Sequence, residues 1–414
     1  MNARVDIPWR GDSFSRVPFD VYCDPAAYEQ ELQRFFYRGH WCYVGLEVEI
    51  PKPGDFKRSW IGERSVIVVR NHDNGIHVVE NRCAHRGVQF CQENFGHAKE
   101  FVCPYHQWNY DLTGRLMGLP FRRGVKRAGT IQGGMPADFK TEEHGLTKLK
   151  VATRGGVIFA CFDHDVPSFE AFLGPDVLAY FDRVFNGRQL MLLGYSRQRI
   201  PGNWKLMQEN IKDPYHPGLL HTWFVTFGLW RADQESRMVM DPTGRHACMV
   251  SRRNSGGKSE VTQGVSSFKE QMKLNDDRVL DVVPEAFWNG PTVVMMTLFP
   301  SLIIQQQVNS LSTRHIVPRG EGVFDFIWTH FGFADDTPEM TRRRLRQANL
   351  FGPAGYVSAD DGEVVEMAQR GATQHVEQAA ISELDGRDVH NTDHMVTETL
   401  IRGMYRYYRQ VMDA

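Results

Sequence analysis

The stretch that decides the fold of the first part of this chain is Cys83-Ala84-His85, followed after seventeen residues by Cys103-Pro104-Tyr105-His106. Each segment supplies one thiol and one imidazole, so the pair can surround a metal centre with two sulfur and two nitrogen donors. A zinc ion accepts the same donors, but zinc fingers place Cys with Cys and His with His. One Cys and one His in each segment favour a [2Fe–2S] cluster with unlike irons, where Cys83 and Cys103 hold one iron and His85 and His106 the other.

The sequence around these segments predicts a small all-β module that carries such a cluster, called a Rieske cluster, at two of its loops. Turn signals occur at Pro53-Gly54, Asp73-Asn74-Gly75 and Thr113-Gly114, where hairpins require them. Between the turns lie short alternating segments, which we expect to be strands at residues 41–48, 64–70, 75–80, 101–104 and 108–111. The basic segment Phe121–Arg127 after them is either a solvated connection or a docking patch for an acidic electron-donor protein.

Length and composition indicate an ordinary globular protein with more than one core. The chain has 414 residues, 42% of them hydrophobic and 24% charged, and its net charge of −2 gives no reason to expect nucleic acid or an anionic membrane as partner. No apolar run reaches the length of a membrane helix, and the first residues lack the apolar core of a signal peptide. Five of the seven cysteines are scattered outside the cluster motif, which predicts a reducing compartment, the cytoplasm.

We expect three regions: an N-terminal helical segment at 1–40 that packs on the catalytic domain, the Rieske domain at 41–155, and a catalytic domain at 156–414. The last region alternates helices with longer strands, which is typical of an α+β domain. Expected strands are 191–200, 247–251, 293–299, 302–308, 315–318 and 323–332. A capped helix begins near Thr337-Pro338 and another occupies Thr397–Val411, whereas Asn254–Gly264 is expected to be a loop.

A second group of metal donors follows the Rieske module. His216 and His221 lie five residues apart, and Asp213 precedes them. An unbroken helix would turn the two rings about 140° apart, but Pro214 and Pro217 predict that the helix is broken here. Two His and one carboxylate with open positions form the facial triad of non-haem Fe(II) oxygenases. Core packing is the alternative for an isolated His pair.

Two carboxylates could complete the triad. Asp213 could ligate the metal or orient an imidazole. Asp361 lies in Ser358-Ala359-Asp360-Asp361, which also resembles a capping box, so it could instead cap a helix. The residue types by themselves do not choose between these roles.

The two motifs together resemble the large (α) subunit of Rieske non-haem iron ring-hydroxylating oxygenases, and the resemblance covers essentially the whole chain. It implies a helix-grip catalytic domain, with antiparallel sheet and helices, in which His216, His221 and Asp361 hold a mononuclear Fe(II). It also implies a head-to-tail trimer, α₃ or α₃β₃ with a small β subunit, in which Asp213 bridges to His106 of the neighbouring chain. Electrons would come from NAD(P)H through a reductase and a ferredoxin, and O₂ would be the oxidant.

Residues 208–224 are similar to the branch that contains salicylate 5-hydroxylases and three-component anthranilate dioxygenases, which act on small aromatic acids. The expected reaction is hydroxylation of salicylate to gentisate, and the alternative is 1,2-dioxygenation of anthranilate or a related acid. Asn210 is expected to serve catalysis beside Asp213. The resemblance places these residues in the substrate pocket: Ile211, Pro217, Val293, Met295, Gln305, Val308, Phe351, Val357 and Ser358.

The two groups of donors also bear on other classes of protein. An electron-transfer or zinc-binding protein would need the first group of donors but not the second. An oxidative demethylase would need both. A substrate carboxylate also calls for a cationic partner, and the sequence assigns no Arg to that role.

Overall fold

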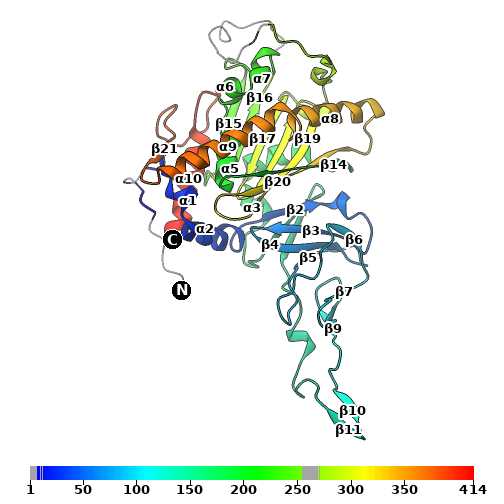
Figure 1. Ribbon diagram of the computed structural model, residues 1–414. Coiled ribbons are helices and arrows are strands. Elements are labelled where there is room, and N and C mark those ends of the chain that lie inside the picture. The colour runs from blue at the N-terminus through cyan, green and yellow to red at the C-terminus, as the bar shows by residue number, and fades with distance from the viewer. Residues whose placement is uncertain (1–6, 10, 12, 254–268, 270) are drawn as a thin grey trace. The chain divides into compact units, whose positions relative to one another are not determined.

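A computed structural model describes residues 7–9, 11, 13–253, 269 and 271–414 of the chain. The loop expected at Asn254–Gly264 lies outside these residues. The chain divides into two units, one made of Tyr37–Val166 and the other of the preceding residues up to Phe36 together with Pro167–Ala414 (Figure 1).

The unit Tyr37–Val166 is built from strands, as the sequence predicts. A four-stranded sheet has the order β5-β4-β3-β6 and two three-stranded sheets have the orders β12-β13-β2 and β7-β8-β9, while β10 and β11 form a hairpin. The pattern of the sequence missed β3, which pairs with both β4 and β6. The strands are β2 Cys42–Leu46, β3 Asp55–Ile61, β4 Arg64–Arg70, β5 Ile76–Glu80, β6 Phe95–His97, β7 Phe101–Val102, β8 Asn109–Tyr110, β9 Leu116–Gly118, β10 Val125–Arg127, β11 Thr130–Gln132, β12 Lys150–Arg154 and β13 Val157–Cys161.

This unit extends beyond residue 155, where the sequence predicted its boundary, because its last hairpin crosses that position. Strand β13 pairs antiparallel with β12 and with β2, and all five of its residues are buried. A boundary between 155 and 156 would separate two strands that exchange backbone hydrogen bonds. The unit therefore continues to Val166.

The second unit is organised around a seven-stranded antiparallel sheet with the order β14-β20-β19-β18-β17-β16-β15. The sequence predicted six of these strands, but it missed β15 and began β19 five residues late, at His315 instead of Ser310. The strands are β14 Leu190–Ile200, β15 Ser236–Met240, β16 Ala247–Ser251, β17 Val293–Leu298, β18 Leu302–Gln307, β19 Ser310–Pro318 and β20 Phe324–Phe333. Antiparallel sheet plus helices is the expected α+β architecture.

Helices cover both faces of this sheet. Helix α5 contacts β17 and β19 on one face, and α9 crosses the same face in Figure 1. Helix α4 lies on the opposite face, where Arg183 donates to the side chain of Gln306. The helices are α3 Phe169–Leu173, α4 Pro175–Val184, α5 Trp204–Lys212, α6 Pro217–Leu220, α7 Thr222–Thr226, α8 Pro338–Phe351, α9 Tyr356–Gln374 and α10 Thr399–Asp413.

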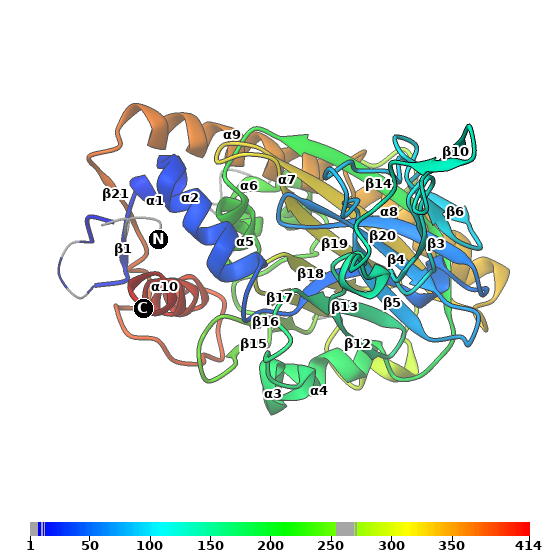
Figure 2. The ribbon, with the colours of Figure 1, turned by 90° about the horizontal axis from the view of Figure 1, so that it is seen from below.

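The two ends of the second unit lie side by side. Figure 2 shows α1 (Asp20–Cys23) and α2 (Pro25–Glu31) beside α10, and a short two-stranded sheet joins β1 (Arg16–Pro18) to β21 (Ala379–Ile381). Tyr405 donates to the hydroxyl of Tyr22 at 3.1 Å, and Tyr408 donates to Glu31 at 2.6 Å. Among the described residues, no helix has both the length and the apolar character that crossing a bilayer requires.

Candidate functional site

Two similar turns present the Cys–His pairs of the first unit. The backbone N–H of Gly87 donates to the carbonyl of Cys83 at 2.9 Å, and that of Gln107 donates to the carbonyl of Cys103 at 2.8 Å. Gly87 has a φ of 73° and Gln107 a φ of 56°, so both turns close through the left-handed region. This conformation is natural for Gly87 and uncommon for Gln107.

The four side chains on these turns fit a cluster with two sulfur and two nitrogen ligands. Both thiols are buried, and the rings of His85 and His106 have centroids 4.6 Å apart. The Nδ1 atoms of both rings are buried without a hydrogen-bond partner among the described residues, which a ligand at these atoms would explain. Trp108 stacks on His85 at 4.8 Å and fixes the plane of that ring.

The chain between α5 and α7 breaks as the prolines predict. Helix α5 ends at Lys212, and the side chain of Asp213 then accepts hydrogen bonds from the backbone N–H groups of Tyr215 and His216, both at 3.1 Å. The Nδ1 atom of His216 lies 2.8 Å from the carbonyl oxygen of Asp213. This bond sets Nδ1 as the donor and leaves Nε2 available to a metal. Asp213 therefore shapes the turn that aims His216.

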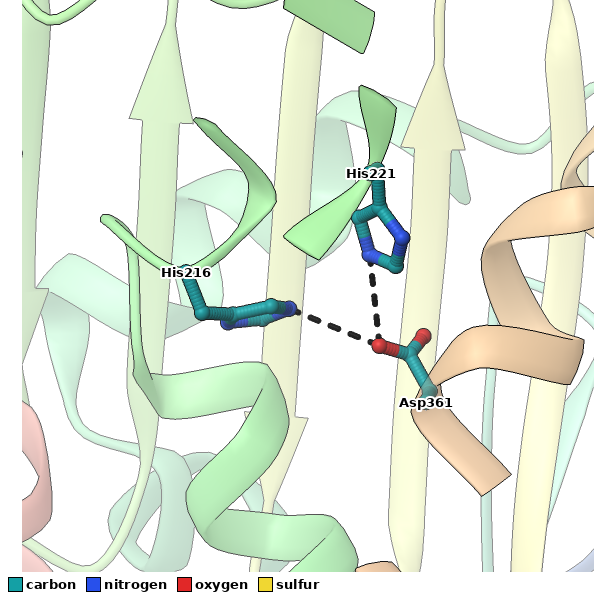
Figure 3. A group of neighbouring side chains, drawn as sticks. All are labelled: His216, His221 and Asp361. Atoms are coloured by element: carbon teal, nitrogen blue, oxygen red, sulfur yellow. Dashed lines mark ion pairs between the residues drawn. The ribbon is translucent and has the colours of Figure 1, made fainter. Parts of the chain in front are cut away.

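Asp361 lies opposite the two rings, and the capping alternative for it is wrong. Helix α9 begins at Tyr356, so Asp361 is inside the helix, where its buried carboxylate points toward His216 and His221 (Figure 3). One carboxylate oxygen lies 3.5 Å from Nε2 of His216 and 3.3 Å from Nε2 of His221. The donor atoms of these three residues lie within 4.8 Å of one another, and Asp213 is not part of the group.

Neighbouring side chains orient this triad, and the carboxylates around it favour a positive charge at its centre. Nδ1 of His221 lies 3.1 Å from the carboxylate of Asp360, and the amide of Asn210 donates to Asp361 at 3.1 Å. Burial by itself would lower the pKa of His216, but its interactions with Asp213 and Asp361 raise that pKa to about 10. Burial also opposes the ionisation of Asp361, but the two imidazoles hold its pKa well below the usual range. Two imidazole nitrogens and one carboxylate oxygen are suitable ligands for Fe(II).

A mostly apolar cavity opens beside the triad. Asn210, Asp361 and both His line it, as do five of the nine residues expected in the pocket: Ile211, Pro217, Val293, Met295 and Val357. Its floor is the sheet face that carries Met249 and Met295, and Phe224 and Trp230 form part of its wall.

The other four expected pocket residues do not line this cavity. Gln305 is fully buried in the sheet, where its amide bonds to neighbouring polar side chains. Val308 and Phe351 belong to an apolar cluster with Trp223 and Trp288. The hydroxyl of Ser358 donates to Gln198 at 2.6 Å, because its position on α9 faces β14.

Arg314 is the cationic residue of the cavity wall, and the sequence did not identify it. Its side chain is buried and its guanidinium lies 3.9 Å above the ring of Trp328. Burial lowers the pKa of Arg314 to about 9, although the charge of Asp361 acts in the opposite direction, so Arg314 is charged at neutral pH. Among the described residues, no carboxylate lies within ion-pair distance of it. Polar residues alternate along the chain at Ser310, Ser312 and Arg314, which share one face of β19, and this pattern could have predicted a strand here. The predicted strand, however, began after them.

Gln307 also lines the cavity, next to Gln305 on β18. The remaining lining residues that the sequence did not identify come from several loops and strands: Pro214, Phe224, Leu229, Trp230, Gln234, Met249, Ser251 and Met395. Their positions along the chain span more than 180 residues, so no local pattern joins them.

Comparison with known proteins agrees with this arrangement. Residues 40–129 match the Rieske [2Fe-2S] domain, and residues 188–414 match the ring hydroxylating alpha subunit (catalytic domain). The chain is 68% identical over 408 residues to the large oxygenase component of salicylate 5-hydroxylase from Ralstonia sp., covering 98% of this chain and 96% of that protein. It is 39% identical over 410 residues to the large subunit of anthranilate 1,2-dioxygenase from Burkholderia cepacia, again covering 98% and 96%.

Solved structures share the fold at lower identity. Naphthalene 1,2-dioxygenase from Rhodococcus sp., bound to indole, superposes with a TM-score of 0.78 at 24% identity, covering 96% of this chain and 94% of that one. At this identity the similarity concerns the fold alone. It agrees with the strand-rich first unit and the large antiparallel sheet of the second.

Proposed function

Because the chain belongs to the family of ring-hydroxylating oxygenase α subunits, with a Rieske [2Fe–2S] domain and a non-haem iron catalytic domain, we propose that it hydroxylates salicylate to gentisate. The observation that carries the choice of an aromatic acid is Arg314, a buried cation in the wall of a mostly apolar cavity, with no carboxylate within ion-pair distance among the described residues. A buried charge of this kind calls for a counter-ion. The salicylate 5-hydroxylase component at 68% identity supports salicylate as that anion.

The metal ligands follow from the donor groups. His216, His221 and Asp361 would hold the mononuclear iron, and the two Cys–His pairs would hold the cluster. When bound, these groups supply reductive activation of O₂, with electrons delivered one at a time. Asp360 and Asn210 then keep His221 and Asp361 in orientation.

The chain's other residues bind and orient the substrate. Arg314 would pair with the carboxylate, and a bond of this charge-assisted kind fixes direction as well as affinity. Ile211, Met295 and Val357 would contact the faces of the ring and exclude water. The ring is thereby held between Arg314 and the triad, with the cation and the metal ligands on different elements of the same unit.

We further propose the assembly and supply of electrons that the family relationship favours. The chain would form a head-to-tail α₃ or α₃β₃ oligomer with a small β subunit, in which His106 of one chain meets Asp213 of its neighbour. Electrons would come from NAD(P)H through a reductase and a ferredoxin. The scattered cysteines favour the cytoplasm as the location.

Anthranilate 1,2-dioxygenation is the second candidate, because Arg314 would hold either acid and a relative at 39% identity is an anthranilate dioxygenase subunit. Incubation of the purified component with ferredoxin, reductase, NADH and ¹⁸O₂ distinguishes the two. Gentisate carrying one labelled oxygen supports salicylate hydroxylation, and catechol formed from anthranilate supports the alternative. Released formaldehyde from a methylated acid would indicate a demethylase instead. A colourless protein that holds zinc and no inorganic sulfide would overturn the whole assignment.

A further inference from the structure

Three consecutive glutamines on β18 have different surroundings. Gln305 and Gln307 face the cavity side of the sheet, whereas Gln306 faces α4, where its side chain accepts a hydrogen bond from Arg183 at 2.8 Å. Gln307 lines the cavity together with Arg314. Gln305 is completely buried between them and does not line the cavity.

The hydrogen-bond partners of Gln305 allow only one orientation of its side-chain amide. A guanidinium contains only donors, so the atom of Gln305 that accepts hydrogen bonds from Arg314 must be the amide oxygen. That oxygen accepts from Nε of Arg314 at 2.9 Å and also from Nη2, and the hydroxyl of Ser312 donates to it at 3.2 Å. The amide nitrogen of Gln305 must therefore point the other way, toward Gln307.

The orientation of the Gln305 amide also fixes the orientation of the Gln307 amide. Nε2 of Gln305 donates to Oε1 of Gln307 at 2.8 Å, so the oxygen of Gln307 is already engaged. Within the described part of the chain, the amide nitrogen of Gln307 and Nη1 of Arg314 are left without hydrogen-bond partners. Both residues line the cavity, so the substrate meets two sets of N–H donors there.

We propose that Gln305 is a positioning residue that sets the hydrogen-bond polarity of the cavity: it anchors Arg314 and turns Gln307 so that both present donors. A substrate with a carboxylate and a neighbouring oxygen, such as salicylate, satisfies these donors with acceptors alone. A carboxamide offers an NH₂ group and only one carbonyl oxygen, so it is bound less well. The inference rests on the proposed function, since it explains selectivity for an acid.

The substitution Gln305→Glu tests this role. A carboxylate at this position still accepts from Arg314 but has no N–H for Gln307, so Gln307 must rotate, donate to Glu and present its oxygen to the cavity. The new charge also offsets that of Arg314. The ratio of the Kd for salicylamide to the Kd for salicylate should therefore fall by at least about tenfold, the effect of one hydrogen bond to a charged group.

The measurement is calorimetric titration of the resting, fully loaded oxygenase with salicylate and with salicylamide. Gln306→Glu is the matched control, because it places the same charge one residue away on the opposite face of the sheet. It should leave the acid-to-amide ratio unchanged, because the new carboxylate faces Arg183 and not the cavity. An equal change of the ratio in both variants would show a general structural effect and overturn the proposal.

Gln307→Leu tests the same inference by another route if Gln305→Glu does not fold. It removes the donor at the cavity wall and leaves Gln305 and Arg314 in place, so preference for the acid should again decrease. A ratio within about threefold of the parent in either Gln305→Glu or Gln307→Leu overturns the positioning role. Failure of the proposed function has a different signature, because the parent protein would then form no gentisate from salicylate, whereas the ratios of Kd are measured without turnover.

Discussion

The substitution Arg314→Met tests the basis of the substrate assignment. Arg314 is only 2% exposed, and the fall of its pKa to about 9 means that burial costs the charged form roughly 5 kcal/mol relative to water. The stacked ring of Trp328 and the amide oxygen of Gln305 compensate for part of this cost. The charge of Asp361 also acts on Arg314 but lies beyond ion-pair distance, so a carboxylate that enters the cavity can supply a direct counter-ion.

The expected loss of affinity follows from that pairing. Truncation of one partner of a buried, hydrogen-bonded charge pair costs about 2–5 kcal/mol, so a central estimate of about 3 kcal/mol raises the Kd for salicylate roughly 150-fold. Methionine has a similar length and retains contact with Trp328. The neutral analogue salicylamide should lose less than about threefold, because it never paired with the charge.

Calorimetric titration of the resting oxygenase measures both ligands without turnover. Iron content and the visible spectrum of the Rieske cluster verify that each variant is fully loaded. Because the charged form of Arg314 is required, binding of salicylate to the parent should also weaken as pH rises through about 9. If Arg314→Met bound salicylate with nearly the parent Kd, the substrate carboxylate would lie elsewhere and Arg314 would not be its partner.

Three further predictions concern the metal centre, the cavity wall and a buried lysine. Asp361→Ala should lose the mononuclear iron and retain the Rieske spectrum, whereas Asp213→Asn should retain both metals and slow electron delivery, as measured by iron analysis and single-turnover kinetics. Gly218→Ala would place a Cβ 2.2 Å from the ring of Trp230, and this overpacking should cost about 1–3 kcal/mol in thermal unfolding and weaken salicylate binding. Burial lowers the pKa of Lys212 to about 7, so between pH 7 and its usual value near 10.5 the unfolded chain binds the extra proton and stability rises with pH. Lys212→Met should raise the melting temperature at pH 7 and flatten that rise.

Each of these predictions has a control and a contradicting outcome. Asp213→Asn serves as control for Asp361→Ala, and an empty iron site in the Asp213 variant would show that the two aspartates have been given each other's roles. A Cβ added at Gly371 would meet no atom within 4 Å, so Gly371→Ala should be harmless. Equal destabilisation by both alanines would contradict the packing argument. An unchanged slope of melting temperature against pH in Lys212→Met would show that another group titrates.

The motifs of this chain predict the chemistry of both donor groups because most of the ligands lie close together in the sequence. The four cluster donors lie between Cys83 and His106, and His216 and His221 lie five residues apart, so the spacing and the prolines limit how these side chains can converge. Asp361, the third ligand of the second group, lies on the distant helix α9, and only the family resemblance pointed to it. Alternation of polar and apolar residues likewise predicted six of the seven strands of the large sheet. Patterns of this kind predicted the family, the α+β fold and the Rieske domain, and the comparisons with known proteins confirm all three.

The sequence alone determined which residues could bind metals and which segments could form strands, but it did not determine the cavity. Only the tertiary structure excluded a capping role for Asp361, since the start of α9 at Tyr356 depends on how that helix packs. Only the tertiary structure brought Arg314 to the cavity wall and buried Gln305 behind it. The physical reason is that alternation along a strand shows only which residues share a face. Contacts between residues far apart in the chain decide which face lines the cavity, which strand lies next to it and which helix covers it.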